Sequence, residues 1–546
     1  MASWFGRKAP ARVPTDIVAP LRYWDDTALL KNVVVFCMSR YDSALNAEKL
    51  YSSLERLLAR KGWRKLGARL RKNDQGNIEY HIPAEFTKER PAVSFSQDRH
   101  DIPISEHPLA SQLPKASTKP AVVGDPVQFT PLTRPPGTPS SLDDYLSQDR
   151  GQVGLHVVSF TDATLICLYY HHTAFDLMGW GALMTAWTHE LHGRGEQNQT
   201  PLLGGDPEDG EDFDPMRRLG TIPTQPHVLT HRHMGIASLI GFSIRNVCDF
   251  LWRKKECRIV SIPGAFVEKL RAQALEELRA EAAEKSDVAD SEPFLSNGDI
   301  LTAWWARLIV RQLLPTDSER TVMIQNAASA RKALSGDFET SVKPYVSNLF
   351  TFVYSLMPAR ELIARPISWL AQQVRRSIVE QGTTREQVEA YYALQRHTPG
   401  RIMPLFGDAG MHMLTFSNWS KADFYGHDFS PARVDAADDT PLYPSYIQAV
   451  QLPLDFPEGT LIVGQDQAGN YWMYGFRVEG LWAKVEQALE EMEAVSEDAQ
   501  VFLKDPTWWY RQPGTPQSLI SAIDPQGNAR IRRVIGILVL FVKHAA

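Results

Sequence analysis

Cysteine is scarce in this chain, with four residues among 546. No two of them form a C-x-x-C pair, the spacing typical of zinc and redox sites, so the sequence indicates neither a metal site nor a disulfide framework. Cys37 and Cys167 lie in apolar stretches, where a cysteine usually acts as a small core side chain. This pattern fits a reducing compartment, and we expect a cytoplasmic protein.

Long apolar runs and an excess of basic charge are also missing. The longest apolar run, residues 534–542, is too short for a membrane-crossing helix, which needs about 20 residues. We expect a buried strand there, with an interfacial membrane anchor as the alternative. The net charge of −6 is spread along the chain, so no basic surface for nucleic acid is indicated.

Nucleotide-binding and metal-binding motifs are absent from the sequence as well. No glycine-rich phosphate loop of either common type precedes a predicted helix. His189 and His192 are one residue too close for a zinc-protease helix, and His227, His231 and His233 lack acidic or cysteine partners at ligand spacing. We therefore expect no metal and no permanently bound cofactor.

Strand and helix patterns alternate in both halves of the chain. Residues 33–38 and a hairpin over 153–170 are apolar and predict strands. In the second half, residues 257–262 and 321–325 predict strands, and residues 300–314 predict a helix between them. The similar order of elements predicts two α/β domains of similar build with a cleft between them.

A polar, acidic stretch separates the halves and sets the expected boundaries. We assign residues 1–220 to an N-terminal domain, residues 221–256 to a crossover linker and residues 257–546 to a C-terminal domain.

The candidate chemistry centres on His172 and Asp176, in the segment YYHHTAFD where an apolar strand ends and a helix begins. About one chance HxxxD match is expected in a chain of this composition, so the spacing alone is weak. Loop edges present side chains into clefts, however, and a histidine can accept a hydroxyl proton near neutral pH, worth roughly 10²–10⁴-fold in rate. The alternative is a structural histidine at a strand end, and these residues alone leave the two readings even.

Three later segments add to this motif. Asp428 and Phe429 form a DF pair that Ser-Pro-Ala follows, and Trp419 stands nine residues before it in the sequence Ser-Asn-Trp. Ser347 and Asn348 end the sequence Pro-Tyr-Val-Ser-Asn. With these four matches in order, the chain resembles the BAHD superfamily of plant and fungal acyltransferases, whose signatures are HxxxD, DFGWG and Tyr-Phe-Gly-Asn. The changed residues resemble a divergent fungal branch.

The resemblance implies an α/β fold of two chloramphenicol-acetyltransferase-like domains with an active-site tunnel between them. It implies that His172 is the general base and that Asp176 is structural and faces an arginine, for which Arg331 is the nearest candidate. Ser417 and Trp419 would donate hydrogen bonds to the oxyanion of the tetrahedral intermediate.

Each of these assignments has a structural alternative. Trp419 could be ordinary core packing, and Ser417 a surface or strand-edge serine. Asp428 and Phe429, with Ser347 and Asn348, would be structural rather than catalytic. The residues that replace Gly-Trp-Gly after Phe429 put the binding of the acyl donor, more than the chemistry, in question.

The function that the resemblance implies is transfer of an acyl group, by default acetyl from acetyl-CoA, to a hydroxyl or less often an amine of a small-molecule secondary metabolite. Acyl-CoA would be a co-substrate, and we expect a monomer. One alternative is a condensation-type enzyme that takes its acyl group from a carrier protein, since His171 and His172 also fit HHxxxDG. Another is a non-catalytic homologue that acts as a binding module. A DNA-binding regulator is disfavoured, because no helix carries clustered Lys and Arg.

Overall fold

The computed structural model describes residues 9–201, 214–251, 253–284, 292–337, 344–435, 437–453 and 458–504. The chain divides into two compact units, Met1–Glu479 and Gly480–Ala546. In the second unit the structure describes helix α12 (Leu481–Lys504). The strand expected at residues 534–542 lies outside the described residues.

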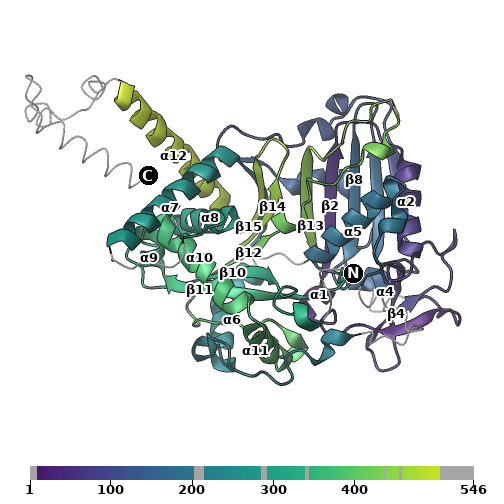
Figure 1. Ribbon diagram of the computed structural model, residues 1–546, viewed down its shortest axis with the longest axis horizontal. Coiled ribbons are helices and arrows are strands. Elements are labelled where there is room, and N and C mark those ends of the chain that lie inside the picture. Colours follow the sequence, from purple (N-terminus) through teal and green to yellow (C-terminus); the bar gives the residue numbers. More distant parts are fainter. Residues whose placement is uncertain are drawn as a thin grey trace, which may run out of the picture. The chain divides into compact units, whose positions relative to one another are not determined.

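A five-stranded sheet carries the HxxxD segment at the end of one of its central strands. Its strands in spatial order are β13 (Tyr446–Pro453), β2 (Val33–Tyr41), β8 (Thr164–His171), β7 (Val153–Ser159) and β5 (Ser94–Arg99). Every residue of β8 is buried, which explains why its sequence is a continuous apolar run instead of an alternating one. Helices α2 (Ala47–Ala59) and α5 (Leu177–Leu191) pack against each other beside this sheet (Figure 1). The hairpin predicted over 153–170 is confirmed.

A seven-stranded sheet forms the other half of the first unit. Its strands in spatial order are β11 (Phe350–Pro358), β10 (Thr321–Ser329), β12 (His412–Asn418), β14 (Glu458–Gln465), β15 (Tyr471–Val478), β9 (Lys255–Ile262) and β6 (Ala121–Gly124). Strand β12 is parallel to both β10 and β14, so the carboxyl ends of these strands meet at one edge. Helices α7 (Gly264–Glu284), α8 (Asn297–Leu313) and α10 (Ile367–Gly382) pack together beside this sheet (Figure 1). The strands predicted at 257–262 and 321–325 and the helix predicted at 300–314 are confirmed.

The smaller elements complete the unit. Strands β1 (Ile17–Pro20), β4 (Ile78–Ile82) and β3 (Arg69–Lys72) form a three-stranded sheet in this order. The remaining helices are α1 (Ala28–Lys31), α3 (Thr130–Thr133), α4 (Leu142–Leu146), α6 (Ile236–Leu251), α9 (Ala359–Ala364) and α11 (Arg385–Arg396). No helix in the described part of the chain is both long and apolar enough to cross a membrane.

The two large sheets exchange an edge strand. Strand β6, from the first 220 residues, pairs with β9 in the seven-stranded sheet, and β13, from the second half of the chain, pairs with β2 in the five-stranded sheet. The buried core also runs without a break from the five-stranded sheet to β9, β14 and β15. The boundaries at residues 220 and 256 therefore stay predictions, because each half of the chain contributes one strand to the sheet of the other half.

The segment predicted as a crossover linker, residues 221–256, is not a plain connection. It contains helix α6, whose Phe242 is 6% exposed and belongs to a core cluster of the same unit. The apolar residues of α6 repeat at helical spacing, although the polar stretch before residue 220 favours a linker.

Candidate active site

The turn between β8 and α5 sets the position of His172. Its backbone N–H donates to the carbonyl of Val33 at 2.9 Å, which extends the pairing of β2 and β8 by one residue. Helix α5 begins five residues later, where the carboxylate of Asp176 caps it by accepting a hydrogen bond from the backbone N–H of Gly179 at 3.1 Å. Strand end and helix cap together hold the short HxxxD turn from both sides.

Asp176 and Arg331 form an ion pair, and Arg331 is the arginine that the family resemblance offered as the nearest candidate. The guanidinium donates two hydrogen bonds of 2.7 Å, one to each carboxylate oxygen. Arg331 also donates to the carbonyls of Tyr345 and Ser347, and the backbone N–H of Leu349 donates to Asp176 at 2.9 Å. Because both oxygens of Asp176 already accept strong hydrogen bonds, this carboxylate is suited to support the turn and not to accept a proton from a substrate.

The electrostatics of His172 favour a proton acceptor. Burial lowers the pKa of its imidazole below the usual 6.5, and the opposing effects of its own carbonyl group and of the Asp176 carboxylate are smaller. The ring is therefore neutral near pH 7, the state that a general base requires.

The neighbouring His171 has a different environment. It is fully buried, its Nδ1 lies 2.7 Å from the hydroxyl of Thr173, and Tyr145 packs edge-on against its ring. Burial lowers the pKa of His171 to about 3. His171 does not line the cavity that His172 faces, so the two histidines are not equivalent.

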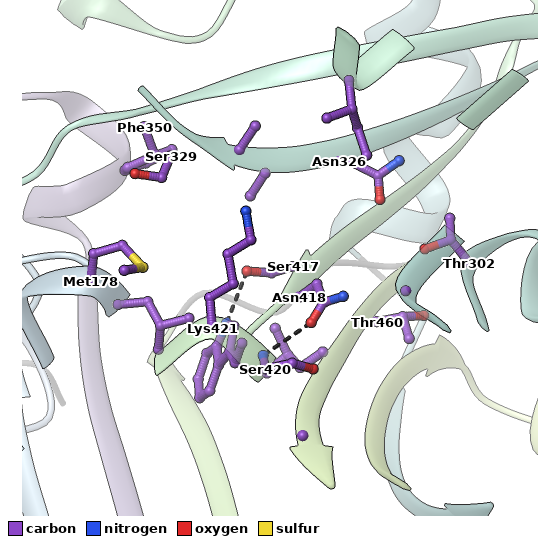
Figure 2. Close-up of a pocket in the computed structure, with 18 of the residues that line it drawn as sticks. Met178, Thr302, Asn326, Ser329, Phe350, Ser417, Asn418, Ser420, Lys421 and Thr460 are labelled. Carbon is purple, nitrogen blue, oxygen red and sulfur yellow. Dashed lines mark hydrogen bonds between the residues drawn. The ribbon is translucent and has the colours of Figure 1, made fainter. Parts of the chain in front are cut away.

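A cavity of about 1060 Å³ opens beside His172. Its walls come from the turn after β8, from strands β10, β12 and β14 and from helices α8 and α10, so both large sheets contribute to it. Figure 2 shows part of this wall, where the side chain of Lys421 extends from the segment after β12 into the cavity. The size and the mixed lining fit an organic molecule of moderate size.

Ser417 and Trp419 lie on this wall at the end of β12, where Figure 2 labels Ser417. The indole Nε1–H of Trp419 donates to the hydroxyl oxygen of Ser417 at 2.9 Å. Trp419 is 4% exposed and stacks on Phe424. Its N–H is directed at Ser417 instead of a substrate, which leaves the Ser417 hydroxyl proton as the donor available to the cavity. This differs from the expectation of two parallel donors.

Asp428 and Phe429 lie away from the cavity. Asp428 accepts hydrogen bonds of 2.8 Å from the backbone N–H groups of Ser430 and Leu442, and Phe429 is fully buried against Tyr41 and Trp187. The loop that replaces Gly-Trp-Gly packs at the start of helix α2. There the carbonyl of Ala432 accepts a hydrogen bond of 2.8 Å from the backbone N–H of Asn46. None of residues 428–432 lines the cavity.

Several residues that line the cavity belong to no sequence motif. Asn326 is 8% exposed, and in the described part of the chain its amide nitrogen has no hydrogen-bond partner. Thr302, Thr460 and Lys421 also face the cavity (Figure 2). They come from separate elements and share no motif, so no local signal could have identified them. In the described ranges, no cluster of His, Cys, Asp or Glu is arranged to hold a metal ion.

Comparison with known proteins identifies the family. Residues 155–433 match the model of the family described as "Transferase family". The chain is 39% identical over 495 residues to "Transcriptional regulator calD" of Penicillium decumbens, covering 89% of this chain and 97% of that protein. It is 34% identical over 496 residues to "Acetyltransferase adrJ" of Penicillium roqueforti, covering 88% and 97%.

The fold is shared with a solved structure, that of TRI101 from F. graminearum complexed with coenzyme A and T-2 mycotoxin. The TM-score is 0.59 at 13% sequence identity, with 86% of this chain and 96% of that one covered. This confirms the predicted class, two chloramphenicol-acetyltransferase-like α/β domains. The chain belongs to the Transferase family and is a BAHD-type acyltransferase.

Proposed function

We propose that this enzyme transfers an acyl group, acetyl by preference, from acyl-CoA to a hydroxyl group of a small-molecule secondary metabolite, with His172 as general base. The observation that carries the proposal is that His172, whose pKa burial lowers, lines a cavity of about 1060 Å³ together with Ser417. The similarity to adrJ, an acetyltransferase, and the coenzyme A and T-2 mycotoxin bound to TRI101 support the donor and the acceptor class. A monomer in the cytoplasm stays a prediction from the sequence.

The reaction is a direct transfer between two bound substrates. The acceptor oxygen attacks the thioester carbon as His172 takes the hydroxyl proton, and the carbonyl π electrons move to the oxygen. Collapse of this intermediate breaks the carbon–sulfur bond, and the imidazolium returns its proton to the departing thiolate, which leaves an ester and free CoA. A covalent acyl-enzyme is not required, since the described cysteines are buried and none of them lines the cavity.

Ser417 is the proposed oxyanion donor, and Trp419 orients its hydroxyl. A Ser417→Ala variant is expected to lower kcat about 10²–10³-fold with little change in KM, because the lost hydrogen bond is made to charge that develops in the transition state. Steady-state kinetics would measure this, with a thermal melt to show that the variant is folded. Trp419→Phe, which keeps the ring packing and removes only the N–H, should have a smaller effect. A Ser417→Ala enzyme with the kcat of wild type would exclude this assignment.

The pH profile follows from the pKa of His172. The base acts only when neutral, and burial lowers its pKa below 6.5, so kcat/KM should be level near neutrality. The rate should fall as the pH drops through this lowered pKa, with the midpoint of the acid limb below 6.5. Measurement of kcat/KM from about pH 5 to pH 8 tests this. A midpoint above 6.5 would mean that another group titrates.

A regulatory role is the second candidate, because the similar protein calD is named a transcriptional regulator. Binding and turnover separate the candidates. A thermal-shift panel of acyl-CoAs with increasing chain length should raise the melting temperature, since a donor at 100 times its Kd stabilises by about 2.7 kcal/mol. Release of free thiol from acyl-CoA, with no carrier protein present, would support the enzyme over a carrier-dependent one. A protein that binds no acyl-CoA and transfers no acyl group would instead support a binding module.

A further inference from the structure

The backbone of the HxxxD turn is held by three side chains from three separate parts of the chain. The carbonyl of His172 accepts a hydrogen bond of 2.9 Å from the side-chain amide of Asn348. The carbonyl of Thr173 accepts a hydrogen bond of 3.1 Å from the hydroxyl of Tyr80. The carbonyl of Ala174 accepts one of 3.3 Å from the ammonium of Lys65. Successive peptide groups after the proposed base are therefore each tied to a different donor.

All three donors meet at one carboxylate, that of Asp25, which is 1% exposed. One carboxylate oxygen accepts hydrogen bonds of 2.8 Å from the side chain and 2.9 Å from the backbone N–H of Asn348. The other lies 3.4 Å from the hydroxyl of Tyr80 and 3.9 Å from the ammonium of Lys65, and it accepts the hydroxyl proton of Ser347 at 2.8 Å. Asp25 thus contacts all three donors, since it accepts from Asn348, lies beside the Tyr80 hydroxyl and pairs with the charge of Lys65.

We propose that Asp25 is a positioning residue for His172. Asp25 orients the three donors that hold the turn, and the turn sets the direction of the imidazole. A hydrogen bond to the carbonyl of residue 172 restricts rotation of that peptide, and the direction of the ring follows from the backbone that carries it. Buried polar groups that are all paired make such a network rigid. This inference rests on the proposed function, because it gives Asp25 a role only if His172 is the base.

The charges around Asp25 show why a carboxylate stands there. The ammonium of Lys65 and the guanidinium of Arg22 both donate to the hydroxyl of Ser347, at 2.8 and 2.9 Å, and both cations are 2% exposed. Burial and the charge of Arg22 lower the pKa of Lys65 to about 7, and the charge of Asp25 acts in the opposite direction. Asp25 therefore favours the protonated form of Lys65, which carries the full set of N–H donors for the turn.

The test compares Asp25→Asn with a matched control. Asp25→Asn keeps the shape and removes the charge, and it is expected to lower kcat about 100-fold with KM for acyl-CoA unchanged. The acid limb of kcat/KM should also move to lower pH, because the Asp25 charge raises the pKa of His172. The control is Asp16→Asn, which removes a buried carboxylate held by two hydrogen bonds from Arg90 at 2.7 and 2.8 Å, away from the turn. Asp16→Asn should melt earlier but keep the kcat and the acid limb of wild type.

Each outcome decides the inference. A folded Asp25→Asn enzyme with the kcat and the acid limb of wild type overturns the inference. An equal fall in kcat for Asp25→Asn and Asp16→Asn, with the acid limb of kcat/KM unchanged, overturns it as well. If Asp25→Asn does not fold, Tyr80→Phe removes a single donor with no change in charge, and a kcat equal to wild type would overturn the inference. If His172→Ala loses turnover while Asp25→Asn retains it, the positioning role of Asp25 is wrong and the proposed function stands. If His172→Ala retains turnover, the proposed function itself fails.

Discussion

Replacing His172 with alanine should lower kcat about 10²–10⁴-fold, the usual contribution of a positioned general base. The protein should still fold, because the bonds that hold the turn are made by the backbone N–H and carbonyl of residue 172, which alanine retains. Binding of acyl-CoA should survive as well, since the cavity draws its walls from both sheets and loses only one side chain. Thiol release measures the turnover, and calorimetric titration with acyl-CoA measures the binding.

The matched control for this variant is His189→Ala. His189 lies on helix α5, where its ring nitrogen Nδ1 is 2.9 Å from the side-chain oxygen of Asn198, and it does not line the cavity. The same substitution there should leave kcat at the level of wild type. Turnover of the His172→Ala enzyme at the rate of wild type would rule out the general-base assignment.

The largest effect on stability is expected from Arg331→Met. This change leaves the Asp176 carboxylate, whose side chain is 7% exposed, without its bidentate partner. Removing one member of a buried ion pair costs about 3–5 kcal/mol of the free energy of unfolding, because the remaining charge is desolvated and unpaired. Urea unfolding followed by circular dichroism measures this loss. The double variant Asp176→Asn with Arg331→Met should recover part of it, since no buried charge is then left alone.

An exposed ion pair provides the comparison. Arg376 and Glu380 are one helical turn apart, 4.0 Å from each other, with side chains 56% and 55% exposed. Arg376→Met should change the free energy of unfolding by less than about 1 kcal/mol. Similar losses for Arg331→Met and Arg376→Met would show that the Asp176 pair does not stabilise the fold through its burial.

Local features of the site could be predicted from the sequence. The apolar run of β8 and the capping Asp176 specify the strand, the turn and the helix start within a few residues of His172. The partner of Asp176 came from the family resemblance, which offered Arg331, after the strand predicted at 321–325, as the nearest arginine.

Long-range features could not be predicted. Asp25 stands in a segment without a motif, and its partners Lys65, Tyr80 and Asn348 lie up to 323 positions away, so only the folded chain brings them together. The direction of the Trp419 indole is similarly hidden, because it depends on a side-chain rotamer that packs on Phe424. Sequence patterns report local conformation and burial, and they carry little information on which distant polar groups meet.

The exchange of β6 and β13 affects whether fragments of this enzyme can fold and when the chain can fold during translation. A chain that stops near residue 220 would lack β13, which leaves the apolar β2 as an open edge strand, the kind of edge that templates association with other chains. A fragment that starts near residue 257 would lack β6 in the same way beside β9. Each half therefore completes its sheet only when the other half is present, so the ribosome must release most of the polypeptide before either sheet can close.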